Sequence, residues 1–500
     1  MRGTTRKGTA PRRMKAYPEP RVRAAGCVDR RKLETQLKRN FARDVTRVQK
    51  LIRQPSVSGE DRGVRDCAKL VAGLLKEAGF DAAELVDTDG HPVVYAELDA
   101  GARHTLLVYS MYDTQPFEGE KWTHAPLDAD VVPLKPFPKV VVGRGAINTK
   151  GPLVAFLNAL LAARETKQTL PVNLKFVGEG EEELGSPHLP RFVTENLERL
   201  RGAEAVLYPA AMQDRSGRPK VWLGNKGILY LELVCSGSRW GRGPIAHDIH
   251  SANKAWVDSP AWRLVTALGT MVSEDGNRVR IDGFYDDVLG PTPQDHALVR
   301  ELAKTFDPEA FRVENKVDHF LDDLEDVRLL EAYLYSSTLN IDGIWGGHTG
   351  PGTKTVLPHE VRARLDVRLV PDQQPEKVLA TIRQHLDRKG FPDIAMEVED
   401  RYEWSQTPAD APIVAAARMA YASMGHESEV WPRVGGSLPM HLFTKDPLRL
   451  PALAAGLGHG GGAHAPDEYM VLEGDGKVEG LVGQELSYLA ILDAFAEVVG

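Results

Sequence analysis

The sequence predicts an α/β fold: a mixed, mostly parallel sheet flanked by helices, with a smaller α+β domain inserted into it. Two observations predict this class. Up to about residue 210, short apolar runs typical of strands alternate with helical patterns, which is the order of a doubly wound sheet. After Gly227 that order gives way to strand–helix–strand units, and helical patterns of the first kind return after about Trp404.

In the first part, helical periodicity covers residues 31–54 and 62–80, and Gly79 is the expected C-cap of the second helix. A third helix is expected at about 152–164. The expected strands share apolar, β-branched character and lie at residues 93–98, 105–110, 172–180 and 204–210.

In the later part, strands are expected at 228–237, 361–371 and 394–402, and helices at 260–273 and 375–389, with a long insertion at about 281–335. The last helices are expected at 412–424 and 483–499. We therefore predict a catalytic domain in two segments, residues 31–225 and 404–500, interrupted by a lid or dimerisation domain at 226–403.

The first thirty residues are basic, rich in proline and poor in acidic side chains. An organelle transit peptide is one interpretation, although the prolines disfavour an amphipathic helix. A disordered tail, or a start codon assigned too early, is the other. Residues 1–30 are therefore expected to lie outside the folded domains.

The overall charge excludes several classes of partner. A net charge of −8 argues against nucleic acid or an anionic membrane surface as the main partner. No apolar run approaches the roughly 20 residues that span a bilayer. The three cysteines, Cys27, Cys67 and Cys235, are widely spaced and form no metal-binding cluster, which fits a reducing cytoplasm.

Six short stretches carry the residue types of a catalytic site, and most follow an expected strand. They read "YSMYDTQP" (109–116), "GRGAINTKGP" (143–152), "EGEEELGS" (179–186), "HDIHSA" (247–252), "GGHTGPGTKTVLP" (346–358) and "GGGAHAPDEY" (460–469). In open α/β sheets, side chains at the carboxyl ends of strands form the usual ligand site. In this order, the six stretches resemble the zinc-dependent peptidase family of carnosine dipeptidases, carboxypeptidase G, aminoacylases and succinyl-diaminopimelate desuccinylases, most closely its dipeptidase branch.

The resemblance implies a site in which two zinc ions share a bridging Asp and a water. Four of the residues it requires are present. Asp113 matches the Asp that orients a ligand, Glu182 the general base, Glu183 a zinc ligand and His464 the last His ligand. Zinc chemistry suits this family because a bound water has a pKa near 7, compared with about 15.7 for bulk water.

Three further positions implied by the resemblance do not carry a ligand. Met111 stands at the first His ligand, Asn148 at the bridging Asp, and Pro209 at the remaining Asp ligand. Met111 and Pro209 remove both private ligands of one ion, and Asn148 replaces an anion with a neutral amide. Zinc prefers His, Cys and carboxylates, so we expect no zinc or a single zinc, and not the two-zinc site.

The resemblance also implies substrate-binding residues. His250 matches a lid-domain His that reaches the site of a neighbouring subunit and stabilises the oxyanion, and Arg368 matches the Arg that clamps the substrate carboxylate. The glycine loops of the carboxylate pocket fall on Gly436 and Ser437 and on Gly350 and Thr353. Two departures are Ala252, in place of the usual Gly, and Lys226, where Arg is frequent.

Three functions remain open from the sequence. The first is an enzyme acting on the amide C–N bond of a dipeptide or N-acyl amino acid with a free carboxylate, at a site with one zinc position lost. The second is a metal-independent enzyme repurposed to other chemistry, such as C–N bond formation. The third is a non-catalytic pseudopeptidase. The resemblance further implies a small-molecule ligand with a carboxylate and a homodimer formed through the inserted domain.

Overall fold

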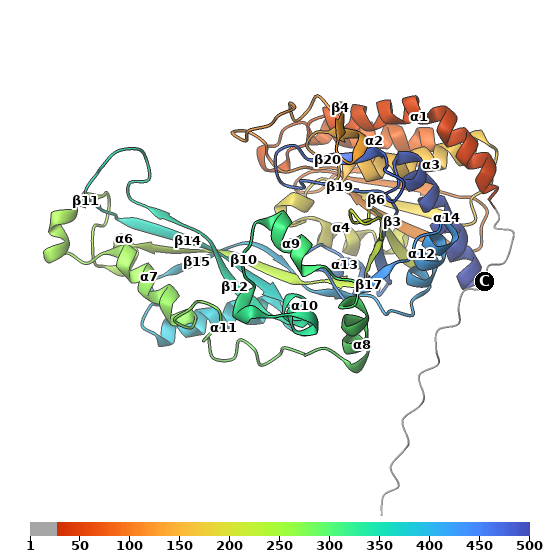
Figure 1. The fold of residues 1–500 in the computed structure, drawn as a ribbon. Coiled ribbons are helices and arrows are strands. Elements are labelled where there is room, and N and C mark those ends of the chain that lie inside the picture. Colours follow the sequence, from red (N-terminus) through yellow and green to blue (C-terminus); the bar gives the residue numbers. More distant parts are fainter. Residues whose placement is uncertain (1–27) are drawn as a thin grey trace, which may run out of the picture.

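The computed structural model describes residues 28–500 and separates into two lobes, a helix-rich body and a long arm (Figure 1). The predicted basic tail lies almost entirely outside the described residues. In the described part, no helix is both long and apolar enough to cross a lipid bilayer.

The body is built on a six-stranded sheet with the order β1-β2-β6-β3-β7-β18. These strands are β1 (Ala82–Val86), β2 (Val93–Leu98), β3 (Thr105–Met111), β6 (Asn173–Glu179), β7 (Ala205–Pro209) and β18 (Ala452–Ala455). The pairs β6–β3, β3–β7 and β7–β18 are parallel, whereas β1–β2 and β2–β6 are antiparallel. The predicted mixed, mostly parallel sheet is confirmed.

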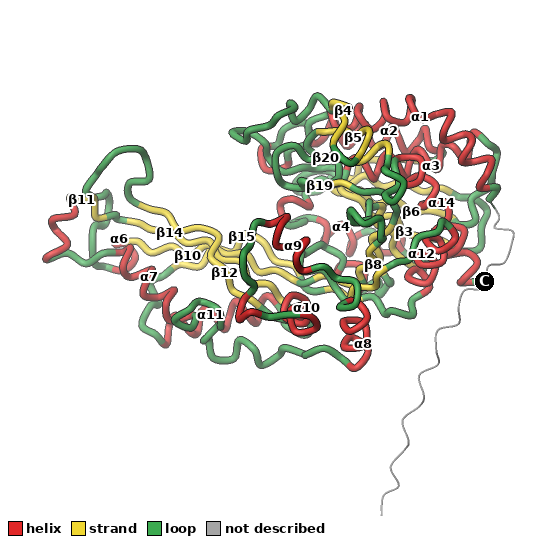
Figure 2. Tube along the Cα trace, viewed as in Figure 1, coloured by secondary structure: helices red, strands yellow, loops and turns green. Residues whose placement is uncertain are grey.

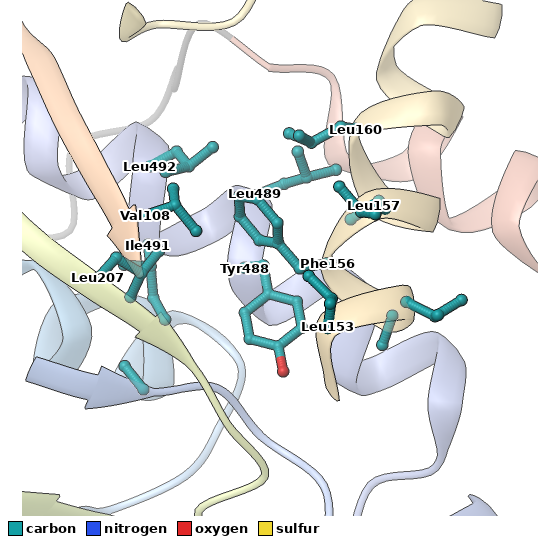
Figure 3. Packing of buried hydrophobic residues seen from close by; sticks show 14 of the residues in the cluster. Val108, Leu153, Phe156, Leu157, Leu160, Leu207, Tyr488, Leu489, Ile491 and Leu492 are labelled. Atoms are coloured by element: carbon teal, nitrogen blue, oxygen red, sulfur yellow. The ribbon is translucent and has the colours of Figure 1, made fainter. Parts of the chain in front are cut away.

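Helices cover both faces of this sheet. On one face, apolar side chains of the sheet pack against α3 and α14 in the centre of the body (Figure 3). The helices of this face are α1 (Arg30–Arg53), α2 (Val64–Ala78), α3 (Lys150–Glu165), α12 (Pro412–Ser423) and α14 (Leu481–Val499). On the other face lie α4 (Leu189–Glu195) and α13 (His441–Thr444). Gly79 caps α2 with φ 107°, as expected.

A second sheet of the body, with the order β19-β20-β5-β4, was not predicted. Its strands are β4 (Asp130–Leu134), β5 (Phe137–Val142), β19 (Gly460–Gly461) and β20 (Tyr469–Glu473). It joins segments more than 300 residues apart, and it places the glycine-rich stretch with His464 beside the stretch with Asn148. Two short pairs complete the body, formed by β8 (Lys220–Trp222) with β17 (Glu429–Trp431) and by β9 (Gly224–Asn225) with β16 (Ser405–Gln406).

The arm is the inserted α+β domain, and Figure 2 shows its strands running along its length. Its antiparallel sheet has the order β12-β14-β10-β15, with strands β10 (Gly227–Ser236), β12 (Thr338–Gly346), β14 (Glu360–Leu369) and β15 (Ala395–Tyr402). Helices α7 (Pro260–Met271) and α11 (Pro375–Arg388) pack on one face of that sheet. The predicted insertion forms α8 (Pro293–Leu302), α9 (Pro308–Asn315) and α10 (Asp326–Tyr335).

Candidate active site

Asp113 lies directly beyond β3 and organises the loop that carries the two glutamates. It is fully buried, and its Oδ2 accepts hydrogen bonds from Ser58 Oγ at 2.8 Å and from the Glu183 N–H at 3.1 Å. Its Oδ1 accepts from the Glu182 N–H at 3.2 Å. Burial, with the charge of Glu183, raises the pKa of Asp113 to about 7. Asp113 therefore fixes the backbone of the predicted general base and of the predicted ligand.

Glu182 is held from the other side by the arm. Tyr402, at the end of β15, donates its hydroxyl proton to the Glu182 carbonyl at 3.2 Å and to Ser186 Oγ at 3.0 Å. Burial, followed by the charges of Glu183 and Asp113, holds the pKa of the Glu182 carboxyl well above its usual range. Contacts from both lobes thus fix the backbone of Glu182.

The loop that carries Asn148 is fixed by Glu468, four residues after His464. The buried Glu468 carboxylate accepts the backbone N–H groups of Gly145, Ile147 and Asn148, each at 2.9 Å. Carboxylates that accept several backbone N–H groups hold a loop rigidly. Glu468 therefore determines where the Asn148 side chain lies.

The Asn148 amide lies between the two predicted metal ligands. Its Nδ2 lies 2.9 Å from Glu183 Oε1, to which it donates, and 2.9 Å from His464 Nε2, while the same Glu183 oxygen is 3.3 Å from His464 Nε2. Gln115 Nε2 donates to the other Glu183 oxygen at 2.8 Å. The hydrogen bond with Glu183 raises the pKa of His464. Glu183 Oε1 therefore accepts from Asn148, and His464 Nε2 lies near both of these side chains.

The other two substituted positions lie at the ends of adjacent strands. Met111 ends β3 and is buried, and Pro209 ends β7. A thioether and a pyrrolidine offer no ligand that zinc prefers. Among residues 28–500, no three His, Cys, Asp or Glu side chains are grouped so that they could hold a metal ion.

The predicted carboxylate clamp comes together where the arm meets the body. Arg368 on β14 donates Nη1 to Ser437 Oγ at 3.0 Å and Nε to Asp366 Oδ2 at 2.8 Å. The Lys226 N–H donates to the Gly436 carbonyl at 3.1 Å. Burial, followed by the charges of Arg433 and Arg368, lowers the pKa of Lys226 to about 8.

Lys226 and Arg433 strengthen the positive charge of this clamp. Both side chains are almost fully buried, and Lys226 Nζ donates to the Ser336 carbonyl at 2.8 Å. The Arg433 guanidinium carbon lies 4.7 Å from the centre of the Tyr335 ring, and its Nη2 donates to Gln406 Oε1 at 3.0 Å. Because buried positive charges are favoured by an anion nearby, this region suits a carboxylate ligand.

The remaining predicted residues lie at the outer end of the arm, away from Glu182. His250 belongs to β11 (Ile249–His250), which pairs with β13 (Val356–Leu357) and lies at the far tip in Figure 1. Gly350 and Thr353 lie in the loop before β13, where His250 Nε2 is 3.1 Å from Thr355 Oγ1. The structure thus groups Asp113, Glu182, Glu183, Asn148 and His464, and separately Arg368, Gly436 and Ser437. It does not bring His250, Gly350 or Thr353 to either group within one chain.

Sequence reasoning missed Glu468 and Gln115. Glu468 lies in a stretch that was singled out, "GGGAHAPDEY", but an acid four residues from a predicted ligand does not reveal which N–H groups it accepts. Gln115 lies two residues after Asp113 in the other stretch, and its contact with Glu183 depends on how two loops meet.

Comparisons with known proteins place the chain among peptidases. Residues 107–477 match the model of peptidase family M20/M25/M40. The chain is 28% identical over 479 residues to the Cys-Gly metallodipeptidase DUG1 of Saccharomyces cerevisiae, covering 90% of this chain and 95% of that protein. It is 31% identical over 301 residues to the human Beta-Ala-His dipeptidase, covering 59% of this chain and 56% of that protein.

A solved structure extends the likeness to nearly the whole fold. The M20 family metallo-carboxypeptidase Sso-CP2 from Sulfolobus solfataricus is 32% identical and superimposes with a TM-score of 0.79, covering 90% of this chain and 99% of that one. A family match across most of the chain and an inserted arm of the same kind lead to one conclusion. The chain belongs to peptidase family M20/M25/M40.

Proposed function

We propose that this chain is an M20 enzyme that acts on the amide C–N bond of a dipeptide or N-acyl amino acid with a free carboxylate, and that the two-zinc site of its family is reduced to at most one ion. The observation that carries the proposal is the presence of two separate groups of side chains. One is Glu182, half-buried and with its backbone held by Asp113 and Tyr402. The other is the Arg368–Ser437 clamp.

The reduced metal site is supported by the donors that remain. Met111 and Pro209 leave one ion without its two private ligands. At the other position the neutral amide of Asn148 replaces a bridging anion, and it hydrogen-bonds Glu183 and lies beside His464. A dication that binds there must break these hydrogen bonds, and the site offers less negative charge to offset that cost.

In the proposed reaction, Glu182 accepts a proton from the attacking water and returns it to the amine as the C–N bond breaks. Arg368 and Ser437 hold the free carboxylate, so that the amide carbon stays near Glu182. Relatives named for Cys-Gly and Beta-Ala-His hydrolysis point to dipeptides as the first substrates to test.

A homodimer through the arm is part of the same proposal, since it would bring His250 to the site of a second copy. Strand β12 lies at an edge of the arm's sheet, with Ile341 and Ile344 of that strand 42% and 49% exposed, and Trp262 on α7 is 66% exposed. An exposed apolar edge strand favours pairing with another strand. The free, buried thiols of Cys67 and Cys235 support the expected cytoplasmic location.

The second candidate is metal-independent C–N bond formation, which the contact between Asn148, Glu183 and His464 favours. Without a metal-bound water, hydrolysis of an activated intermediate is suppressed. This alternative uses the same Glu182 and the same clamp. It predicts an enzyme that joins an amine to an activated carboxylate and does not cleave dipeptides.

The test is hydrolysis of Cys-Gly, β-Ala-His and N-acetyl amino acids by the purified protein, with and without a chelator, beside Glu182→Gln. We expect cleavage of at least one class and a loss of about 100-fold or more in Glu182→Gln, with an unchanged melting temperature. Equal activity in both proteins would remove Glu182 from the reaction. No cleavage by the wild type would favour the second candidate.

A further inference from the structure

One face of the arm's sheet carries a row of charged side chains. Helices α7 and α11 cover the face with Leu365, Val367 and Leu369 of β14. Because alternate residues of a strand share a face, Asp366 and Arg368 lie together on the opposite one. The arm therefore places an acid next to the arginine of the proposed clamp.

Asp366 is the carboxylate that Arg368 contacts. Arg368 Nε donates to Asp366 Oδ2 at 2.8 Å, and the Asp366 side chain is 10% exposed, compared with 33% for Arg368. On the neighbouring strand β12, Asn340 pairs with Asp366, and a bulge follows at Asp342. Asp342 accepts from Asn340 Nδ2 at 2.9 Å, and burial, followed by the charge of Asp366, raises its pKa. Of these two acids, only Asp366 accepts a hydrogen bond from Arg368.

This contact divides the donors of the Arg368 guanidinium. Asp366 takes Nε, and Nη1 donates to Ser437 Oγ at 3.0 Å. For Nη2, the structure shows no acceptor among residues 28–500. The Arg368 backbone is fixed as well, because its carbonyl accepts from Ser337 Oγ at 3.0 Å. A guanidinium is planar, so the bonds at Nε and Nη1 set the direction in which the free Nη2 points.

A carboxylate ligand binds more tightly to an arginine that is already held in the bound orientation, because less conformational freedom is lost. Resting on the proposed function, we infer that Asp366 is a positioning residue of the clamp. It accepts from Nε and so presents Nη2 of Arg368, together with the hydroxyl hydrogen of Ser437, to the free carboxylate of the substrate. Asp366 does not touch the substrate, and its negative charge partly offsets the attraction of Arg368 for the carboxylate.

Two substitutions separate the orientation effect of Asp366 from the effect of its charge. Asp366→Ala removes both the acceptor and the charge, whereas Asp366→Asn removes the charge and keeps an oxygen that accepts from Nε. In the Glu182→Gln background, which prevents turnover, calorimetry compares the binding of N-acetylalanine with that of N-acetylalaninamide. We expect the preference for the carboxylate to fall about 10-fold in Asp366→Ala and to change less than about threefold in Asp366→Asn.

Glu232→Ala is the matched control. Glu232 is a buried acid on the same face of the sheet, but it pairs with Arg362 and Arg364 and not with Arg368. Its loss should lower the melting temperature and leave the ratio of the two affinities unchanged. With a substrate that the wild type cleaves, Asp366→Ala should raise KM about 10-fold and change kcat less than about threefold, as on loss of binding that is equal in ground and transition states.

The outcomes separate this inference from the proposed function. If the protein with the native clamp prefers the carboxylate and Asp366→Ala keeps that preference, Asp366 does not position Arg368 and the proposed function stands. A loss in Asp366→Asn as complete as in Asp366→Ala would assign the effect to charge and overturn the positioning role. If the protein with the native clamp binds both ligands equally, the clamp of the proposed function fails, and this inference fails with it.

Discussion

Replacing Arg368 with Gln isolates the recognition of the substrate carboxylate from the chemistry. Arg368 is 33% exposed and already shares Nε with Asp366. An ion pair at about 4 Å with an effective dielectric constant near 20 is worth about 4 kcal/mol. Solvent exposure and Asp366 reduce this, so we expect about 1.5–3 kcal/mol, as for a hydrogen bond to a charged group. That corresponds to roughly 10- to 100-fold in Kd.

The assay is calorimetry in the Glu182→Gln background, which prevents turnover, with N-acetylalanine and with N-acetylalaninamide. The protein with Arg368 should prefer the carboxylate over the carboxamide by that factor, and Arg368→Gln should lose the preference. Arg362→Gln is the control, since Arg362 lies on the same strand and face but pairs with Glu232 and Glu360. A carboxylate preference that survives in Arg368→Gln would refute the clamp.

Three further predictions concern assembly, pH and stability. A mixture of inactive His250→Ala and inactive Glu182→Gln should regain activity once the subunits exchange, because one site of the mixed dimer then has both His250 and Glu182. No recovery in a verified mixed dimer would exclude His250 acting across subunits. Lys226 has a pKa lowered to about 8, so it loses its charge as pH rises through 8, and the carboxylate preference should weaken there; Lys226→Arg, which stays charged, should keep it at pH 9. Glu485 is fully buried, and burial raises its pKa well above the usual range. As pH rises above about 5, the carboxyl ionises in the unfolded chain but stays neutral in the folded one, so the free energy of unfolding falls. Glu485→Gln should therefore be more stable than the wild type at pH 8, by on the order of 1 kcal/mol, and equal to it at pH 5; the opposite order at pH 8 in a melting experiment would contradict a neutral Glu485.

Much of the fold could be predicted because local pattern and tertiary environment agree. The strands β2, β3, β6 and β7 are buried on both sides and appear as continuous apolar runs. The sheet with β4 and β5 escaped prediction for two reasons. Strand β4 is largely exposed and contains Pro133, and β20, the other partner of β5, lies far away in the sequence.

The site could be predicted only where a residue acts through its own position in a motif. Asp113, Glu182 and Glu183 follow strands in recognisable stretches, and the structure brings them together. The role of Glu468 depends on which backbone N–H groups face it, and that of Gln115 on how two loops meet. His250 lies at the arm's tip, so its contribution depends on a second chain, which one sequence does not place.

The zinc content of the protein tests the reduced metal site most directly. Protein purified without added metal, and a second sample dialysed against excess zinc and then freed of unbound ion, are measured by elemental analysis. If Met111, Asn148 and Pro209 stand in place of three ligands, as we propose, both samples should hold at most one zinc per chain. Two zinc ions per chain in either sample would contradict the loss of a metal position.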